Sequence, residues 1–268
     1  MNPPSPLSIP KNLPVVLTIA GSDNSCGAGA QADLKTITAL GGYAQTAITC
    51  VVAEVPGRVT SIQPVTPRIV AEQVRLSLEA FPVAAIKTGM LFSAAIIRAI
   101  AAELDAISRP PPLVVDPVMV ASSGDPLLKK SAIAAYESRL FPRAALVTPN
   151  LDELRILSGQ PCRNLEEMLA AGRALVCRFG VPFLLKGGHL KARRAVDLLV
   201  SSSGTEEFVA DFIRGADTHG TGCTYSAAIA TGLAQGLSLS ASVAQAKAFI
   251  TRAIATRLRW KKTTALRH

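Results

Sequence analysis

The chain has 268 residues, 49% of them hydrophobic, which is enough for one large core or two small ones. No apolar run approaches the ~20 residues that a membrane-spanning helix needs, which argues against an integral membrane protein. The net charge is +9, but aromatic residues make up only 4%, so platforms for stacking nucleic-acid bases are scarce.

The basic residues are densest near the C-terminus, and we interpret residues 261–268 as a solvated basic tail rather than a nucleic-acid surface. Residues 1–13 are rich in proline and lack the order of a signal peptide, which predicts a flexible leader on a cytoplasmic protein. The five cysteines form no CxxC pair, so a disulfide framework or a zinc site is not expected.

Short apolar runs alternate along the chain with longer amphipathic segments. Strands are expected at 15–20, 47–53, 84–87, 113–116, 145–148 and 183–185, with a hairpin formed by 195–200 and 207–212. Helices are expected at 27–40, 66–81, 93–107, 164–179, 222–235 and 240–258. This order predicts a single α/β domain over residues 14–260, with a central, mostly parallel sheet covered by helices on both faces.

The second of these helices shows the clearest local signals. Thr66 is expected as its N-cap and Pro67 as its first residue. Its predicted apolar face consists of Val70, Val74, Leu78 and Phe81. In such sheets a ligand lies at the carboxyl ends of the strands, so the polar residues after each apolar run are the candidates for function.

Residues 27–32 match the pattern GxGxxA, and Glu54 follows the next strand, which together imitate a dinucleotide fingerprint. Six residues, 21–26, separate the strand from that glycine turn, whereas the fingerprint needs the strand to run almost directly into it. An oxidoreductase is therefore disfavoured. There is also no GxxxxGK[ST] stretch, which excludes a P-loop.

The most informative segment is 215–224, which is rich in glycine and precedes a helix with a small apolar face. Glycines allow a close approach of the backbone to a ligand, and a helix N-terminus offers unpaired N–H donors. The segment therefore predicts an anion hole for a phosphoryl group. Cys223 is expected at the helix N-terminus with a lowered pKa, as a group that accepts or orients a proton; the alternative is a small buried cysteine.

Seven stretches in a fixed order now indicate a family. They are Thr18-Ile-Ala-Gly-Ser-Asp23, Gly27-Ala-Gly-Ala-Gln-Ala-Asp-Leu-Lys35, Lys87-Thr-Gly-Met90, Val115-Asp-Pro-Val-Met119, Thr148-Pro-Asn-Leu-Asp-Glu153, Lys186-Gly-Gly-His189 and His219-Gly-Thr-Gly-Cys-Thr224. With them the chain resembles the hydroxymethylpyrimidine/phosphomethylpyrimidine kinases of thiamine biosynthesis, within the ribokinase superfamily. Most of that superfamily has an aspartate base at position 223, and cysteine there is typical of this branch.

The resemblance implies a ribokinase-like fold and a pyrimidine site near the carboxyl end of the first strand. The residues implied to bind the substrate are Gly21, Asp23, Ala28, Val52, Glu54, Met90 and Cys223. Glu54 is suited to accept a hydrogen bond from an exocyclic amine, and Met90 to lie against a flat ring. The alternatives are ordinary core packing for Met90 and a turn-forming role for Asp23.

The resemblance also implies ATP and Mg²⁺ as cofactors. Asn150, Lys186 and Thr221 are implied to bind the nucleotide, and Glu153 and Asp116 to lie near the metal; a helix cap is the alternative for Asn150. Gly220, Gly222, Cys223 and Lys186 are implied to carry the catalysis. His189 and His219 are expected to orient or support the site rather than to react.

Two departures from the family pattern concern the substrate. Cys26 replaces a usual glycine, which predicts strain if the position needs positive φ. Val55-Pro56-Gly57 replaces the usual Asn-Thr. A pyridoxal kinase of the same branch is the closest alternative: Glu54 favours the pyrimidine, whereas a thiol at Cys26 is suited to trap an aldehyde. A non-catalytic binding protein on the same fold is the further alternative, and a homodimer is expected by analogy alone.

Overall fold

The computed structural model describes residues 13–119, 130–188, 194–213, 215, 219–261 and 263–268. Within them, nine strands form one sheet in the order β3-β2-β1-β4-β5-β6-β7-β8-β9. Its parallel centre consists of β2 (Tyr43–Val55), β1 (Val15–Asp23), β4 (Val83–Thr88), β5 (Leu113–Val115), β6 (Leu146–Val147) and β7 (Phe183–Lys186). Antiparallel strands form the two edges: β3 (Arg58–Pro64) at one, β8 (Arg194–Ser201) and β9 (Gly204–Asp211) at the other. The predicted α/β fold with a mostly parallel sheet is confirmed.

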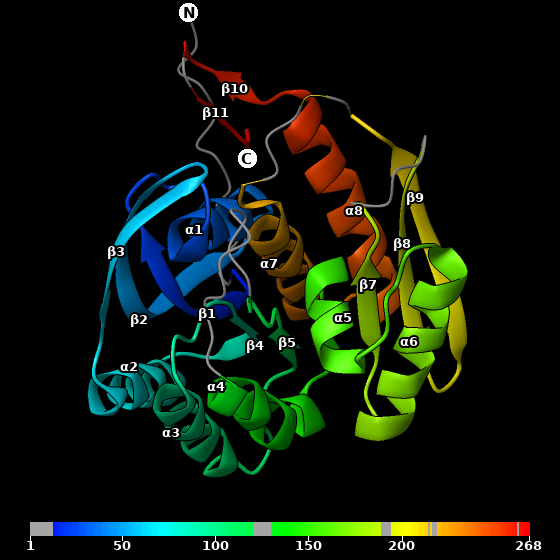
Figure 1. Cartoon of the computed structure of the whole chain (residues 1–268). Coiled ribbons are helices and arrows are strands. Elements are labelled where there is room, and N and C mark those ends of the chain that lie inside the picture. Colours follow the sequence, from blue (N-terminus) through cyan, green and yellow to red (C-terminus); the bar gives the residue numbers. More distant parts are fainter. Residues whose placement is uncertain (1–12, 120–129, 189–193, 214, 216–218, 262) are drawn as a thin grey trace, which may run out of the picture.

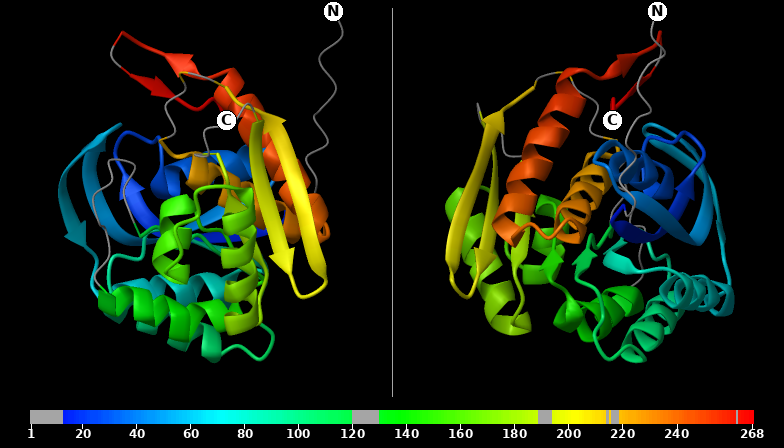
Figure 2. Two further views of the ribbon diagram at one scale, coloured as in Figure 1. Left: turned by 45° about the vertical axis from the view of Figure 1, so that its right-hand side comes forward. Right: turned by 180° about the vertical axis from the view of Figure 1, so that it is seen from behind.

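Helices cover both faces of this sheet (Figures 1 and 2). One face carries α2 (Pro67–Ala80), α3 (Ala94–Asp105), α4 (Lys130–Ala135), α5 (Leu151–Ser158) and α6 (Leu165–Phe179), with a π-turn at Tyr136–Leu140 and a 3₁₀ turn at Phe141–Arg143. The other carries α1 (Gly29–Ala39), α7 (Thr221–Ala234) and α8 (Leu239–Ala255). Neighbouring strand residues serve opposite cores, as Val16 and Leu17 do, because successive side chains point to opposite faces.

The helix starts follow the local signals in most cases. Asn164 accepts a hydrogen bond from Glu167 N at the start of α6, and Pro67 is the first residue of α2. Thr66 occupies the N-cap of α2 but makes no side-chain capping bond. Phe81, predicted on the apolar face of α2, is instead 43% exposed and stacks on Tyr43 with 6.2 Å between ring centroids. The helix ends before it, so position 81 no longer follows the helical repeat.

The C-terminal residues differ from the predicted solvated tail. Helix α8 ends at Ala255, and β10 (Leu258–Arg259) pairs with β11 (Thr264–Ala265) in a small hairpin at the opposite end of the molecule from α2 and α3 (Figure 1). Leu266 is buried in the core beneath α7 and α8, and His268 Nε2 lies 3.0 Å from Thr224 Oγ1. One apolar side chain is enough to anchor the end of a polar segment, and composition alone does not reveal it.

The predicted leader falls almost entirely outside the described residues. In the described part of the chain, no helix combines the length and the apolar character needed to cross a membrane.

Candidate functional site

The carboxyl ends of β1, β2, β4, β5 and β7 lie at one edge of the sheet, because these strands are parallel. The N-terminus of α7 reaches the same edge: a Cβ at Gly222 would lie 3.3 Å from Lys186 Nζ and 3.5 Å from Asp116 Oδ2. The predicted site residues thus come from distant parts of the sequence to one region, which has a β1–β2 side and a β5–β7 side.

On the β1–β2 side, Asp23 organises the loop between β1 and α1. Its Oδ1 accepts a hydrogen bond from Ser25 N (2.6 Å), and its Oδ2 accepts from Gly27 N (3.1 Å) and Ala28 N (2.8 Å). His219 Nε2 lies 3.2 Å from the same Oδ2. Burial alone would raise the pKa of Asp23, but these hydrogen bonds outweigh it and lower the pKa to about 2. The carboxylate therefore acts as a loop organiser, in line with its turn-forming interpretation.

Replacing Asp23 with asparagine is expected to lower the free energy of unfolding at pH 7 by roughly 1–2 kcal/mol. The folded-state pKa of about 2 lies below the ordinary 3.8, so the charged group stabilises the fold above pH 3.8, and this contribution disappears as the pH falls toward 2. Urea titrations of both proteins at a series of pH values check this. The stability gap should narrow in acid, and a gap that widens there would contradict the assignment.

Cys26 has a φ of 58° in this loop, in the left-handed region that favours glycine. The strain expected from a cysteine at a usual glycine position is therefore present. Replacing Cys26 with glycine should raise the free energy of unfolding by roughly 0.5–1 kcal/mol, because the left-handed conformation costs a non-glycine residue about 1–2 kcal/mol. The matched Cys26→Ala variant keeps the strain and should show no gain, as measured by urea titration; equal gains in both variants would rule strain out.

Glu54, Asp23 and His219 each place one potential ligand atom within 4.8 Å of the others. Burial and the nearby Asp23 raise the pKa of Glu54. Gly21 and Met90 lie nearby at the ends of β1 and β4, where a Cβ at Gly21 would be 3.7 Å from Met90 Sδ. Glu54, His219 and Met90 therefore lie around the carboxyl end of β1. This combination of polar groups and a thioether suits the binding of a small heteroaromatic ring.

The loop that contains Gly27 and the loop that contains Gly220 pack against each other at the start of α7. Gly220 is its N-cap, with a φ of 77°, and a Cβ there would lie 1.8 Å from Gly27 O. Thr221, Gly222 and Cys223 form the first turn of the helix. The first turn of a helix directs backbone N–H donors and the positive end of the helix dipole toward its N-terminal side.

On the β5–β7 side, Lys186 Nζ donates a hydrogen bond of 2.9 Å to Asp116 Oδ1. Glu153 is buried: its Oε1 accepts from Met119 N and its Oε2 from Asn150 N. Asn150 Oδ1 accepts from Glu153 N, so the two residues form a capping box at α5. Asn150 therefore has the cap role that was its alternative.

Burial raises the pKa of Glu153 to about 7. The attraction of Lys186 lowers this pKa, and the repulsion from Asp116 offsets part of that lowering. Glu153 is therefore partly protonated near neutral pH, and a bound cation would favour its charged form. Hard oxygen donors in such a place fit Mg²⁺, which usually keeps several waters and contacts few protein groups.

Cys223 is the third residue of α7, as predicted, but its expected acidity is wrong. Burial raises the pKa of the thiol to about 11, and the buried acids Asp33 and Asp116 raise it further. Lys87 and the backbone N–H of Gly29 act in the opposite direction but do not offset the burial. The helix N-terminus alone is therefore too weak to acidify this thiol.

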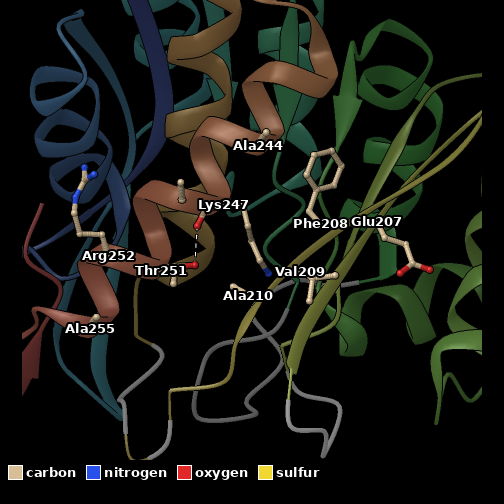
Figure 3. Close-up of a pocket in the computed structure, with 10 residues that line it drawn as sticks. Glu207, Phe208, Val209, Ala210, Ala244, Lys247, Thr251, Arg252 and Ala255 are labelled. Atoms are coloured by element: carbon tan, nitrogen blue, oxygen red, sulfur yellow. Dashed lines mark hydrogen bonds between the residues drawn. The ribbon is translucent and has the colours of Figure 1, made fainter.

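A groove of about 530 Å³ between β9 and α8 was not foreseen (Figure 3). Lys247 reaches from α8 to Asp197 Oδ2 on β8 with a bond of 2.6 Å, and Asp197 Oδ1 accepts from Gly187 N directly after Lys186. The groove is thus linked through a buried acid to the β5–β7 side. No sequence signal marks it, because its lining mixes alanine and valine with ordinary polar surface residues such as Glu207 and Arg252. His189 lies outside the described residues.

Comparison with known proteins gives a consistent family. The chain matches the family model described as phosphomethylpyrimidine kinase over residues 23–266. It is 47% identical over 239 residues to a thiamine biosynthesis bifunctional protein of Geobacter sulfurreducens, covering 89% of the chain but only 49%, about half, of that relative. A hydroxymethylpyrimidine/phosphomethylpyrimidine kinase of Rhizobium meliloti is 42% identical, with 90% of each chain covered.

The fold is similar to solved structures of a phosphomethylpyrimidine kinase and of pyridoxal kinases. A phosphomethylpyrimidine kinase of Clostridium difficile has a TM-score of 0.79 at 37% identity, covering 90% of this chain and 99% of that one. A pyridoxal kinase of Staphylococcus aureus, in complex with AMP-PCP and pyridoxal, has a TM-score of 0.86 at 33% identity, covering 96% and 94%.

Proposed function

The chain belongs to the phosphomethylpyrimidine kinase family, and we propose that it transfers the γ-phosphoryl group of ATP to 4-amino-5-hydroxymethyl-2-methylpyrimidine and then to the resulting monophosphate. The observation that supports this best is the first turn of α7. It lies between the Glu54 and Met90 region and the Lys186 and Asp116 region, where a phosphoryl group would pass from nucleotide to alcohol.

The pyrimidine would lie on the β1–β2 side. Glu54 would accept a hydrogen bond from the exocyclic amine, and Met90 would pack against the ring beside Gly21. Ala28 and Val52 would complete the apolar wall. Asp23 would act through the loop that it holds, since its oxygens are already engaged there.

The phosphoryl group would be stabilised by this chain's own donors. The backbone N–H groups of residues 220–223 would donate hydrogen bonds to its developing negative charge, and Thr221 would contribute at the first position of the helix. Lys186 would leave Asp116 to neutralise the triphosphate, while Asp116 and Glu153 would hold Mg²⁺ through water, where the ion supplies further charge neutralisation.

The nucleoside would extend into the groove between β9 and α8. Phe208, Val209 and Ala244 line part of it with apolar side chains suited to a flat base (Figure 3), and the hydrogen bonds of Asp197 to Lys247 and to Gly187 N support a connection from the groove toward Lys186. In-line attack by the hydroxymethyl oxygen would then be directed by Cys223, whose raised pKa keeps it a neutral thiol, and the hydroxyl proton would pass to a phosphoryl oxygen or to water.

The test is the formation of ADP by the purified protein with Mg-ATP and the pyrimidine alcohol, with the phosphorylated products identified by ³¹P NMR. Formation of the monophosphate and then the diphosphate is the expected result. If calorimetry detects binding of the pyrimidine but no ADP forms, the protein is a binding protein on a kinase fold and the proposed activity is wrong.

A pyridoxal kinase is the second candidate, because solved pyridoxal kinases share this fold at 33% identity. Glu54 favours the pyrimidine, since the resemblance places methionine at this position in pyridoxal kinases. A single kinase domain over residues 14–260, a homodimer and a cytoplasmic location belong to the same proposal. Size-exclusion chromatography with light scattering tests the oligomeric state.

A further inference from the structure

The end of β2 continues past β1, the strand with which it pairs in parallel. The last residues in register between these two strands are Asp23 of β1 and Val52 of β2. Glu54 lies two residues beyond this pair, where β1 has ended and the chain enters the loop toward α1. A backbone N–H at such a position needs an acceptor from outside the ladder or from water.

The side chain of Asn24 supplies this acceptor. Its Oδ1 accepts a hydrogen bond of 2.7 Å from Glu54 N, although the two residues are 30 positions apart in the sequence. Asn24 directly follows the last residue of β1, so its side chain takes the place of a further residue of that strand. Asparagine suits this role, because its side-chain amide carries the same carbonyl group as the backbone.

The strand on the other side of β2 does not hold Glu54 in a regular ladder. The register between β2 and β3 shifts between Ala53 and Glu54: Ala53 pairs with Ser61 and Glu54 with Val59, so Thr60 is left between them. An extra residue of this kind is a β-bulge, which disrupts the ladder locally and changes the direction of neighbouring side chains. The direction of the Glu54 side chain therefore depends on the Asn24 bond.

The site also repels the Glu54 carboxylate. One of its oxygens lies within 4.8 Å of an oxygen of Asp23, which is itself held in place by the backbone N–H groups of Ser25, Gly27 and Ala28. Burial raises the pKa of Glu54, and the repulsion from Asp23 raises it further. Without a bond to its backbone, Glu54 would move away from Asp23 and out of the region beside Met90.

We infer that Asn24 is a positioning residue for substrate recognition, which holds the backbone of Glu54 so that its carboxylate faces the exocyclic amine of the pyrimidine; this role rests on the proposed function. The same loop carries Gly27, and a Cβ at Gly220 would lie 1.8 Å from Gly27 O. The loop between β1 and α1 therefore contacts both the ring-binding acid and the start of the helix that would bind the phosphoryl group.

The test compares Asn24→Ala and Asn24→Asp with a matched control, Thr60→Val. Thr60 Oγ1 donates an equally short, exposed bond of 2.7 Å to Ala53 O, next to Glu54, but this bond joins β3 to β2 and not β2 to the loop. Calorimetry without ATP gives the dissociation constant of the pyrimidine alcohol. Amide hydrogen exchange followed by NMR without any ligand reports whether the Glu54 N–H keeps its acceptor.

Asn24→Ala should raise the Kd of the pyrimidine alcohol by a factor of about 3–10 and should speed exchange at the Glu54 amide, because one hydrogen bond is lost. Asn24→Asp keeps an acceptor oxygen and should restore most of both properties. Thr60→Val should leave both unchanged. The kcat and the KM for ATP should change little in all three variants, since neither side chain touches the reacting atoms.

An unchanged Kd in Asn24→Ala, or an equal rise in Thr60→Val, would overturn the inference. A lower urea midpoint with an unchanged Kd would overturn it too, since the bond would then only stabilise the loop. If the parent protein itself binds no pyrimidine, the proposed function is wrong and the role in recognition is lost with it. Exchange at the Glu54 amide separates these cases, because it reports the Asn24 bond without any ligand.

Discussion

Replacing Gly220 with alanine is expected to reduce kcat by a factor of 100 or more, because it displaces the backbone N–H donors that would stabilise the phosphoryl group. The same change should destabilise the fold by about 2–4 kcal/mol. The position has a φ of 77°, and the new Cβ would meet Gly27 O at 1.8 Å and Gly27 C at 2.8 Å. Neither contact is with a flexible side chain, so the two loops must separate. The first turn of α7 would then lose its place beside Lys186.

Gly236 is the matched control for this change. Its φ is 82°, yet nothing lies within 4 Å of a Cβ built there. Gly236→Ala should therefore cost only the conformational strain, roughly 1 kcal/mol, and should leave kcat unchanged. Steady-state kinetics and urea titration separate the two variants. Equal effects at both positions would contradict the role of the loop contact.

Replacing Cys223 with alanine should lower kcat by roughly 10²–10⁴, because it removes the group that directs the hydroxyl proton while the anion hole remains. KM should change little, since the thiol is not proposed to hold the ground-state substrate. Cys223→Asp should retain more activity than Cys223→Ala, because the resemblance places an aspartate base there in most of the superfamily. These values come from steady-state rates with the pyrimidine alcohol.

Cys177 provides the control, as an exposed cysteine at the far end of α6. Cys177→Ala should keep wild-type kinetics and stability. Full activity in Cys223→Ala would show that the substrate hydroxyl needs no protein group at this position to direct its proton.

The parts of the fold that the sequence predicts well are those fixed by local patterns. Alternating apolar runs locate the central strands, and Asn164 marks a helix start with its own side chain. The prediction that Phe81 lies on the apolar face of α2 is wrong because the helix ends before it. The burial of Leu266 is missed because a single apolar residue in a basic segment gives no periodic signal. Both depend on tertiary contacts that local spacing does not encode.

The site shows the same division. The glycine motif predicts the approach of backbone and ligand, and a cysteine at a usual glycine position predicts the positive φ of Cys26. The electrostatics are not predictable in this way. The pKa of Cys223 depends on burial and on Lys87, whose partner Asp33 is 54 positions away. The spacing of Asn150 and Glu153 predicts their capping box, but it does not predict the burial of Glu153 beside Lys186.

The substrate preference is tested by the ratio of kcat/KM for the pyrimidine alcohol to kcat/KM for pyridoxal. It would be measured with Mg-ATP for the wild type and for Glu54→Met. We expect a preference for the pyrimidine on the order of 100-fold in the wild type, because the half-buried Glu54 carboxylate would be left without a donor by a ring that lacks the amine. This preference should collapse in the variant. A wild-type preference for pyridoxal that the substitution leaves unchanged would contradict this expectation.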